Sequence, residues 1–111
     1  MFDLRNHKEL IKSEVNKLRD SDKNWGWSIK SLNKKEIRVN WGYGTYCGGW
    51  DGVTWFSIKL MEDKDTKALV TEAPAGEKNY YFIGENHWDD GNIEICILKA
   101  FKWCKYTAHN Y

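Results

Sequence analysis

The chain has 111 residues, which is enough to bury one hydrophobic core without a disulfide framework or a structural metal. Its formal net charge of +1 removes the argument that a strongly basic total would make for a polyanion-binding protein, and equally the argument for an acidic mimic of nucleic acid. Seven Trp, six Tyr and four Phe are too many rings for a small core to hide, so some of them should be exposed.

The first element predicted along the chain is a helix over residues 3–20. Its apolar positions recur at intervals of seven, four and three: Leu4, Ile11, Val15 and Leu18. The sequence offers two starting points for this helix. Asn6 followed by Glu9 has the spacing of a capping box, whereas Asp3 would cap the helix one turn earlier.

From residue 25 the apolar period changes to two, which is typical of strands. A hairpin is predicted from residues 25–29 and 37–43 around a polar turn at 33–34. Further strands are predicted at 53–61, 67–72 and 80–83. In the third strand one face should hold Phe56, Ile58 and Leu60, and the other Val53, Trp55 and Met61. Between the second and third strands, residues 42–52 contain five glycines and three aromatic residues and are predicted to be a loop or wide turn.

The last element is predicted to be a helix capped by Asp89 or Asp90. Its apolar stripe consists of Ile93, Cys96, Ile97, Ala100, Phe101, Cys104 and Ala108. A strand is the competing interpretation, because residues 93, 95 and 97 also alternate. Helix is favoured since the stripe continues to residue 108 and three lysines lie toward its C-terminal end.

These elements predict a single α+β domain over residues 1–111. It should contain an N-terminal helix, an antiparallel sheet of four or five strands, and a C-terminal helix. Both helices should cover one face of the sheet. The other face, expected to be partly aromatic, and the 42–52 loop are then the natural contact surfaces, and an exposed patch there would also permit a homodimer.

Catalytic and cofactor chemistry find little support in the residues. Cys104 and His109 are five positions apart on the predicted helix, which separates them by roughly 140° and prevents a nucleophile pair. The adjacent side chains of residues 86–91 rarely converge on one ion. We therefore expect no enzyme activity, no cofactor and no metal.

Three cysteines cannot all pair within one chain, which suits a reducing cytoplasm. No segment approaches the roughly 20 apolar residues that span a bilayer, so no membrane association is expected.

Aromatic side chains next to basic ones leave two interpretations of the hairpin. They either form a stacking platform for single-stranded nucleic acid or pack as core against the helices, and exposed Trp and Tyr suit protein interfaces at least as well as nucleobases. The residues predicted to bind a partner are Tyr43, Tyr46, Trp50, Trp41 and Trp88.

In its size, its lack of active-site motifs and its Lys-, Asn- and Ile-rich character, the whole chain resembles the single-domain inhibitors that phages and mobile elements encode against bacterial defence systems, including anti-CRISPR proteins. The resemblance implies a non-enzymatic inhibitor that occludes a partner surface, such as that of a nuclease or toxin. Many such inhibitors are acidic, whereas this chain is near neutral, which argues against DNA mimicry. The alternative is a nucleic-acid or nucleotide-binding module.

The Gly-rich connection generates the first testable prediction, because loops on a rigid sheet often carry recognition. Trp50→Ala should weaken partner binding by about 2 kcal/mol with little loss of fold, because aromatic anchors dominate interfaces. Titration of the variant against the captured partner, with its melting curve as the control, measures this. Normal binding, or melting of the domain, would place the contact surface elsewhere.

Overall fold

The computed structural model of the chain describes residues 1–21, 25–44 and 50–110, with side chains at all of these except 25, 43, 44 and 50–53. It confirms the α+β fold: two helices and a five-stranded antiparallel sheet in the order β1-β2-β3-β4-β5. The elements are a 3-10 turn η1 (Leu4–His7), α1 (Lys8–Ser21), β1 (Trp25–Leu32), β2 (Glu36–Gly44), β3 (Trp50–Glu62), β4 (Lys67–Glu72), β5 (Lys78–Phe82) and α2 (Ile93–Ala108).

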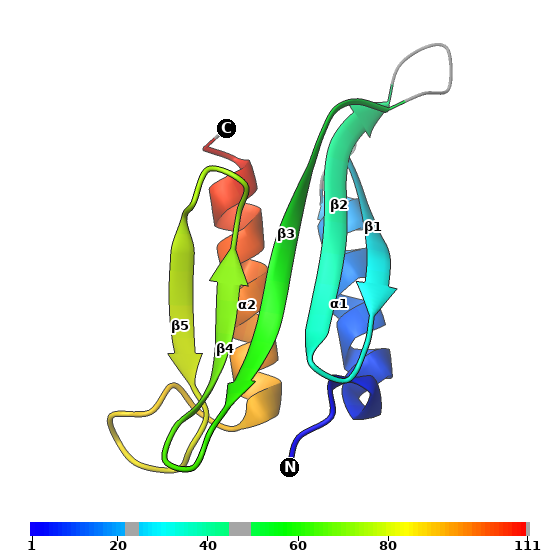
Figure 1. Ribbon diagram of the computed structural model, residues 1–111. Coiled ribbons are helices and arrows are strands. Elements are labelled where there is room, and N and C mark those ends of the chain that lie inside the picture. The colour runs from blue at the N-terminus through cyan, green and yellow to red at the C-terminus, as the bar shows by residue number, and fades with distance from the viewer. Residues whose placement is uncertain (22–24, 45–49, 111) are drawn as a thin grey trace.

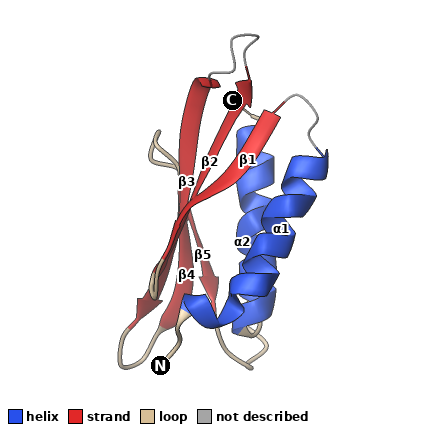
Figure 2. Cartoon of the chain, turned by 90° about the vertical axis from the view of Figure 1, so that its right-hand side faces the viewer, coloured by secondary structure: helices blue, strands red, loops and turns tan. Residues whose placement is uncertain are grey.

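The molecule has two layers. The strands follow one another across the sheet as a meander, with β1 and β5 at the two edges (Figure 1). Figure 2 shows both helices on the same side of the sheet, so the prediction that the helices share one face is confirmed. In the described part of the chain no helix lies on the opposite face of the sheet, and this asymmetry positions the candidate site described below.

Asp3, the earlier of the two predicted caps, caps the 3-10 turn η1 that leads into α1, and α1 itself begins at Lys8. The Asp3 carboxylate accepts a hydrogen bond from the Arg5 backbone N–H at 3.0 Å and forms an ion pair with the Arg5 guanidinium at 2.7 Å. This guanidinium is the main reason why the pKa of Asp3 falls to about 2. The apolar stripe of α1 is buried as predicted at Ile11, Val15 and Leu18.

The first hairpin forms as predicted around Asn33. Its side-chain Oδ1 accepts the backbone N–H groups of Lys35 and Glu36 at 3.0 and 2.9 Å, which fixes the turn. The resulting register places Trp27 opposite Trp41. Both rings then point toward the helices.

Aromatic rings form the centre of the core beneath the helices. Phe56 of β3 stacks on Trp27, with ring centroids 5.7 Å apart, and Trp41 lies 5.9 Å from Trp27. From α2, Trp103 meets the Phe56 ring edge-on at 6.2 Å. The predicted faces of β3 are confirmed where described, because Phe56, Ile58 and Leu60 are buried and Trp55 and Met61 lie on the other face.

Residues 93–108 form a helix, as favoured over the strand interpretation, and every residue of the predicted stripe is buried. The predicted cap was wrong, however. Asn92 caps α2 by accepting the Ile95 backbone N–H at 2.9 Å. Asp90 instead accepts the Phe82 backbone N–H at 2.7 Å and pairs with Lys99 at 3.7 Å, so its carboxylate ties the edge of the sheet to α2.

Part of the predicted 42–52 loop is strand. β2 continues to Gly44 and β3 begins at Trp50, so the backbone of residues 42–44 and 50–52 belongs to the sheet, while residues 45–49 are not among the described residues. Backbone hydrogen bonds between β2 and β3 explain why these strands extend into the Gly-rich segment, because a glycine can still pair its backbone N–H and C=O groups in a sheet. Within the described part of the chain, no helix has both the length and the apolarity to cross a membrane.

The α2 stripe generates a stability prediction with a matched control. Phe101 is 1% exposed in the core, so Phe101→Ala should lower the free energy of unfolding by about 3–5 kcal/mol through lost burial and a cavity. The neighbouring Lys102 is exposed, so Lys102→Ala should change it by less than about 0.5 kcal/mol. Urea titrations of both variants measure the difference, and similar small effects would contradict the helix register.

Candidate binding surface

The face of the sheet that carries no helix, here called the open face, is set by strand alternation. Since Val39, Phe56 and Leu69 point into the core, their neighbours along each strand point away from the helices. Strand pairing arranges these outward residues in rows. The open face consists of Glu36, Arg38, Asn40, Trp55, Ser57, Lys59, Met61, Ala68, Val70, Glu72, Lys78, Tyr80 and Phe82.

A basic and aromatic cluster lies on β2 and β3. The Arg38 guanidinium sits 4.4 Å from the centre of the Trp55 ring, within the range of a cation–π contact. The Glu36 carboxylate accepts the Ser57 hydroxyl at 2.8 Å and lies 3.7 Å from the Arg38 guanidinium. Lys59 approaches the same carboxylate at 4.0 Å. The Glu36 carboxylate thus faces both basic groups, and the three charges together leave a net charge of +1.

Aromatic rings continue toward the β5 edge. Tyr80 and Phe82 stack with centroids 6.4 Å apart, and they remain 45% and 41% exposed. Trp88, in the segment between β5 and α2, is 68% exposed and packs edge-on against His87 at 4.6 Å. Exposed rings of this size are costly to leave in water, which is why such groups mark contact surfaces.

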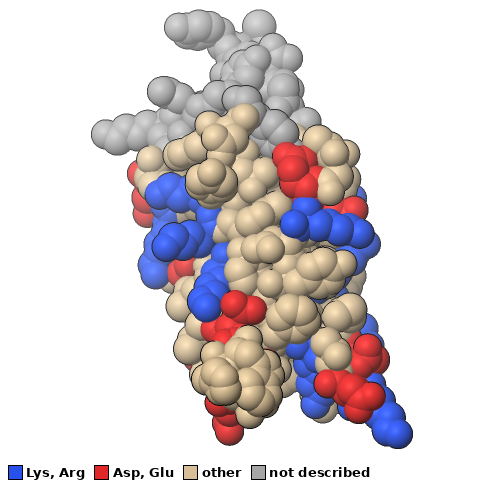
Figure 3. Space-filling view, turned by 90° about the vertical axis from the view of Figure 1, so that its left-hand side faces the viewer, with Lys and Arg blue, Asp and Glu red and all other residues tan. Residues whose placement is uncertain are grey.

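Charges of both signs border these rings. Figure 3 views the molecule from the β5 edge, with an uncharged band running down its middle. Basic groups gather on the helical side of this band, whereas basic and acidic groups mix on the side of the open face. In the strand pairing Glu72 lies opposite Lys78.

The structure places the predicted partner-binding residues in different environments. The prediction that Trp41 contacts a partner was wrong, because the Trp41 side chain is only 5% exposed and packs in the core with Trp27. Trp88 is exposed, as a contact residue must be. Tyr43 and Trp50 have their backbones in β2 and β3, but their side chains, like the whole of Tyr46, lie outside the described residues, so their role stays a prediction.

Three aromatic residues of the surface were not predicted to bind: Trp55, Tyr80 and Phe82. The sequence held a signal for Trp55, because the alternation of β3 places it on the face opposite Phe56. The same alternation in β5 separates Tyr80 and Phe82 from Tyr81. The alternation within the strands does not show which of the two faces of the sheet the helices cover.

The cysteines of α2 occupy the core. Burial raises the pKa of the Cys104 thiol, and burial together with the nearby Asp90 carboxylate raises the pKa of Cys96 from 9.0 to about 11. Cys104 is buried in the core, whereas His109 is exposed at the C-terminal end of α2. Among the described residues no group of three or more His, Cys, Asp or Glu side chains is arranged to hold a metal ion.

Comparison with known proteins adds no relative: no family model, no curated protein and no solved structure matches this chain. The function is therefore inferred from the geometry of the open face.

The buried thiols generate a prediction about reactivity. A pKa about two units higher lowers the thiolate fraction roughly a hundredfold at pH 8, so iodoacetamide should label Cys96 far more slowly in the folded than in the urea-unfolded chain. The unfolded chain also loses this proton first, so folding stability should fall as the pH rises from 9 toward 11. Mass spectrometry of labelled peptides and urea titrations at several pH values measure both effects; equal labelling rates would contradict the burial of this thiol.

Proposed function

We propose that this chain is a non-enzymatic protein that binds a partner protein through the open face and acts by occluding the partner's surface. The observation that carries the proposal is a row of exposed rings on a rigid sheet, with Tyr80 and Phe82 stacked and more than 40% exposed. Tyr, Trp and Phe are enriched in protein interfaces because they bury a large area with few rotatable bonds.

The charges around the rings favour a protein over a nucleic acid. Arg38, which lies over the Trp55 ring, and Lys59 both face the Glu36 carboxylate. A phosphate backbone would have to approach this carboxylate as well as Glu72. Aromatic anchors with a rim of mixed charge are typical of protein interfaces, whereas nucleic-acid sites present unopposed basic groups.

The alternative is a nucleic-acid or nucleotide-binding module. Its best support is on the helical side, where a hollow of about 420 Å³ between α1 and α2 is lined by Lys17, Lys102 and Lys105. Its apolar lining consists of Leu18, Leu98 and the buried Phe101 ring. Glu14 also lines the hollow and pairs with Lys17 at 3.0 Å, so Lys102 and Lys105 are left to bind phosphate, and no aromatic face is exposed there for a base.

Occlusion fits the way in which the surface is built. Sheet ladders and the aromatic core hold the open face rigid, and binding by a preformed surface loses little conformational entropy. An inhibitor of this kind needs only shape and charge complementarity to a nuclease or toxin, in keeping with the resemblance to phage-encoded anti-defence inhibitors. Self-association through the same rings is the competing use of the surface.

The proposal predicts a loss of binding that is confined to one side of the molecule. Tyr80→Ala and Phe82→Ala should each weaken binding of the captured partner by about 1–3 kcal/mol, because they remove exposed anchors. Tyr106→Ala is the matched control, since this ring is 71% exposed on α2 and should not contribute. Affinity capture from the native host, with and without nuclease treatment, followed by titration calorimetry, measures both.

Three outcomes would contradict the proposal. Captured material that disappears on nuclease treatment would support the nucleic-acid alternative. A loss of binding in Tyr106→Ala with full binding in Tyr80→Ala would move the contact to the helices. Dimerisation of the purified chain that Tyr80→Ala abolishes would show that the open face binds a second copy instead.

A further inference from the structure

The two edges of the sheet differ in how far they are protected. At the β1 edge, the Arg19 guanidinium of α1 donates to the Trp27 carbonyl at 3.0 Å, and a bulge between Ile29 and Ser31 interrupts the regular pairing. Features of this kind keep an edge strand from pairing with a further strand. At the β5 edge, protection is confined to the lower end of the strand.

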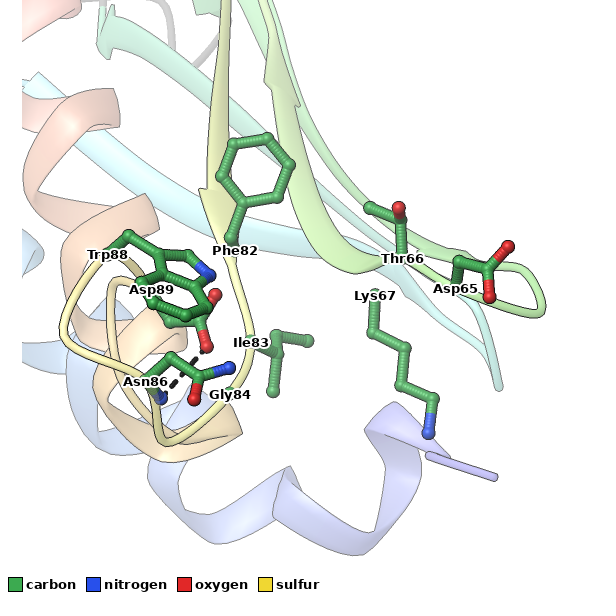
Figure 4. Close-up of a pocket in the computed structure, with 9 residues that line it drawn as sticks. All are labelled: Asp65, Thr66, Lys67, Phe82, Ile83, Gly84, Asn86, Trp88 and Asp89. Carbon is green, nitrogen blue, oxygen red and sulfur yellow. Dashed lines mark hydrogen bonds between the residues drawn. The ribbon is translucent and has the colours of Figure 1, made fainter.

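The lower end of β5 is covered by the chain that follows it. The Phe82 N–H donates to the Asp90 carboxylate at 2.7 Å, and the Phe82 carbonyl accepts the Asp90 N–H at 2.9 Å. Figure 4 shows this segment below Phe82, where its Trp88 lines one wall of a hollow of about 470 Å³ and Asp65 lines the other. A further strand therefore cannot pair with Phe82.

The upper part of β5 has free backbone groups. The Ile83 N–H and the Asn79 carbonyl form hydrogen bonds with β4, at 2.8 and 3.3 Å, so the odd-numbered residues turn their backbone groups toward β4. By alternation Lys78 and Tyr80, like Phe82, turn theirs outward. Among the described residues, none is hydrogen-bonded to the backbone N–H or C=O of Lys78 or Tyr80.

These two free positions complement each other around a twofold axis. Antiparallel pairing of β5 with β5 of a second copy, with the axis at Asn79, places Lys78 of each copy opposite Tyr80 of the other. In such a pair the two residues exchange both of their backbone hydrogen bonds. Every outward N–H and C=O of Lys78 and Tyr80 is then satisfied. This self-complementarity favours a second copy over a strand of another protein.

Both ends of this pairing close without conflict. Phe82, which is already bonded to Asp90, falls opposite Gly76 of the other copy. Gly76 has a φ of 96°, and its N–H donates to the Ala73 carbonyl at 3.0 Å, so the chain turns back toward β4 at this point. The turn therefore bends away from the other copy and leaves room for its Asp90.

The same register sets no like charges together on the open face. Within one chain Lys78 lies opposite Glu72, and Tyr80 lies opposite Val70. In the pairing, the other neighbour of Lys78 is the Tyr80 ring of the second copy, which is a favourable cross-strand pair. A register shifted by two residues either opposes Lys78 to itself or requires the covered Phe82 to pair.

We propose that this chain self-associates through β5, with two copies paired antiparallel around Asn79 to form one continuous sheet. The inference goes beyond the proposed function and does not rest on it. Edge pairing uses the backbone and leaves the open faces of both copies uncovered, so the dimer presents two contact surfaces to a repetitive partner. Because the paired segment is short, the dimer should dissociate on dilution.

Proline at position 78 tests the backbone hydrogen bonds. Lys78→Pro removes an N–H that donates across the axis, and proline is tolerated at the first residue of an edge strand. Lys78→Ala is the matched control, because it removes the same side chain and keeps the N–H. In sedimentation velocity over a concentration series, Lys78→Pro should raise the dissociation constant by roughly tenfold, and Lys78→Ala by less than about threefold.

Engineered cysteines test the register independently. Asn79 faces Asn79 of the second copy with Cα atoms roughly 4.5 Å apart, within the range that a disulfide spans. In a Cys47→Ser background, Asn79→Cys should therefore form a cross-linked dimer on oxidation. Glu77→Cys is the matched control, since residue 77 is also exposed but its two copies lie roughly 13 Å apart along the strands. It should cross-link at least about fivefold less.

Three results would overturn edge pairing: a wild-type chain that is monomeric throughout the series, wild-type association of a folded Lys78→Pro, or equal cross-linking of the two cysteine variants. If Lys78→Pro does not fold, as its ¹H–¹⁵N spectrum reports, the cross-linking comparison decides.

The proposed function is tested separately. Tyr80→Ala keeps the backbone groups of β5, so it should weaken partner binding while leaving the dimer intact. Loss of the dimer in this variant would contradict edge pairing and the proposed function alike, whereas full partner binding with an intact dimer would contradict the proposed function alone.

Discussion

The burial of Trp27, Trp41 and Phe56 on one face of the sheet is the constraint on which the rest of the structure depends. These rings form a contiguous cluster, and each is 5% exposed or less. Covering so much aromatic surface requires both helices on the same side, since neither helix alone spans the sheet (Figure 1). The opposite face is then left without a cover, and its outward rings become the surface available for binding.

Much of this arrangement could be predicted from periodicity. A period of two placed Phe56 and Ile58 on one face of β3, and a period near 3.6 placed Cys96 and Phe101 on one stripe of α2, because local alternation follows directly from backbone geometry. The cap of α2 was missed for a physical reason. Asp90 has a partner at the distant Phe82 backbone, and no local pattern distinguishes a carboxylate that caps a helix from one that ties down a sheet edge.

The binding surface was harder to predict. Alternation separates Tyr80 from Tyr81, but it cannot say which of them faces solvent, because that depends on where α1 and α2 pack. Trp41 shows the same difficulty: its aromatic character suggested an anchor, whereas its pairing with Trp27 makes it core. The hollow beside Trp88 needed the folded chain, since Asp65 and Trp88 are distant in sequence and line its opposite walls.

Footprinting of side chains tests the central claim most directly, namely that the uncovered sheet face is where the partner binds. Carbene labelling of the free chain should modify Trp55, Tyr80 and Phe82 on the open face and Tyr106 on α2. With the partner bound, the three rings of the open face should be protected while Tyr106 labels as before. Protection of Tyr106, with unchanged labelling of Tyr80 and Phe82, would contradict the account.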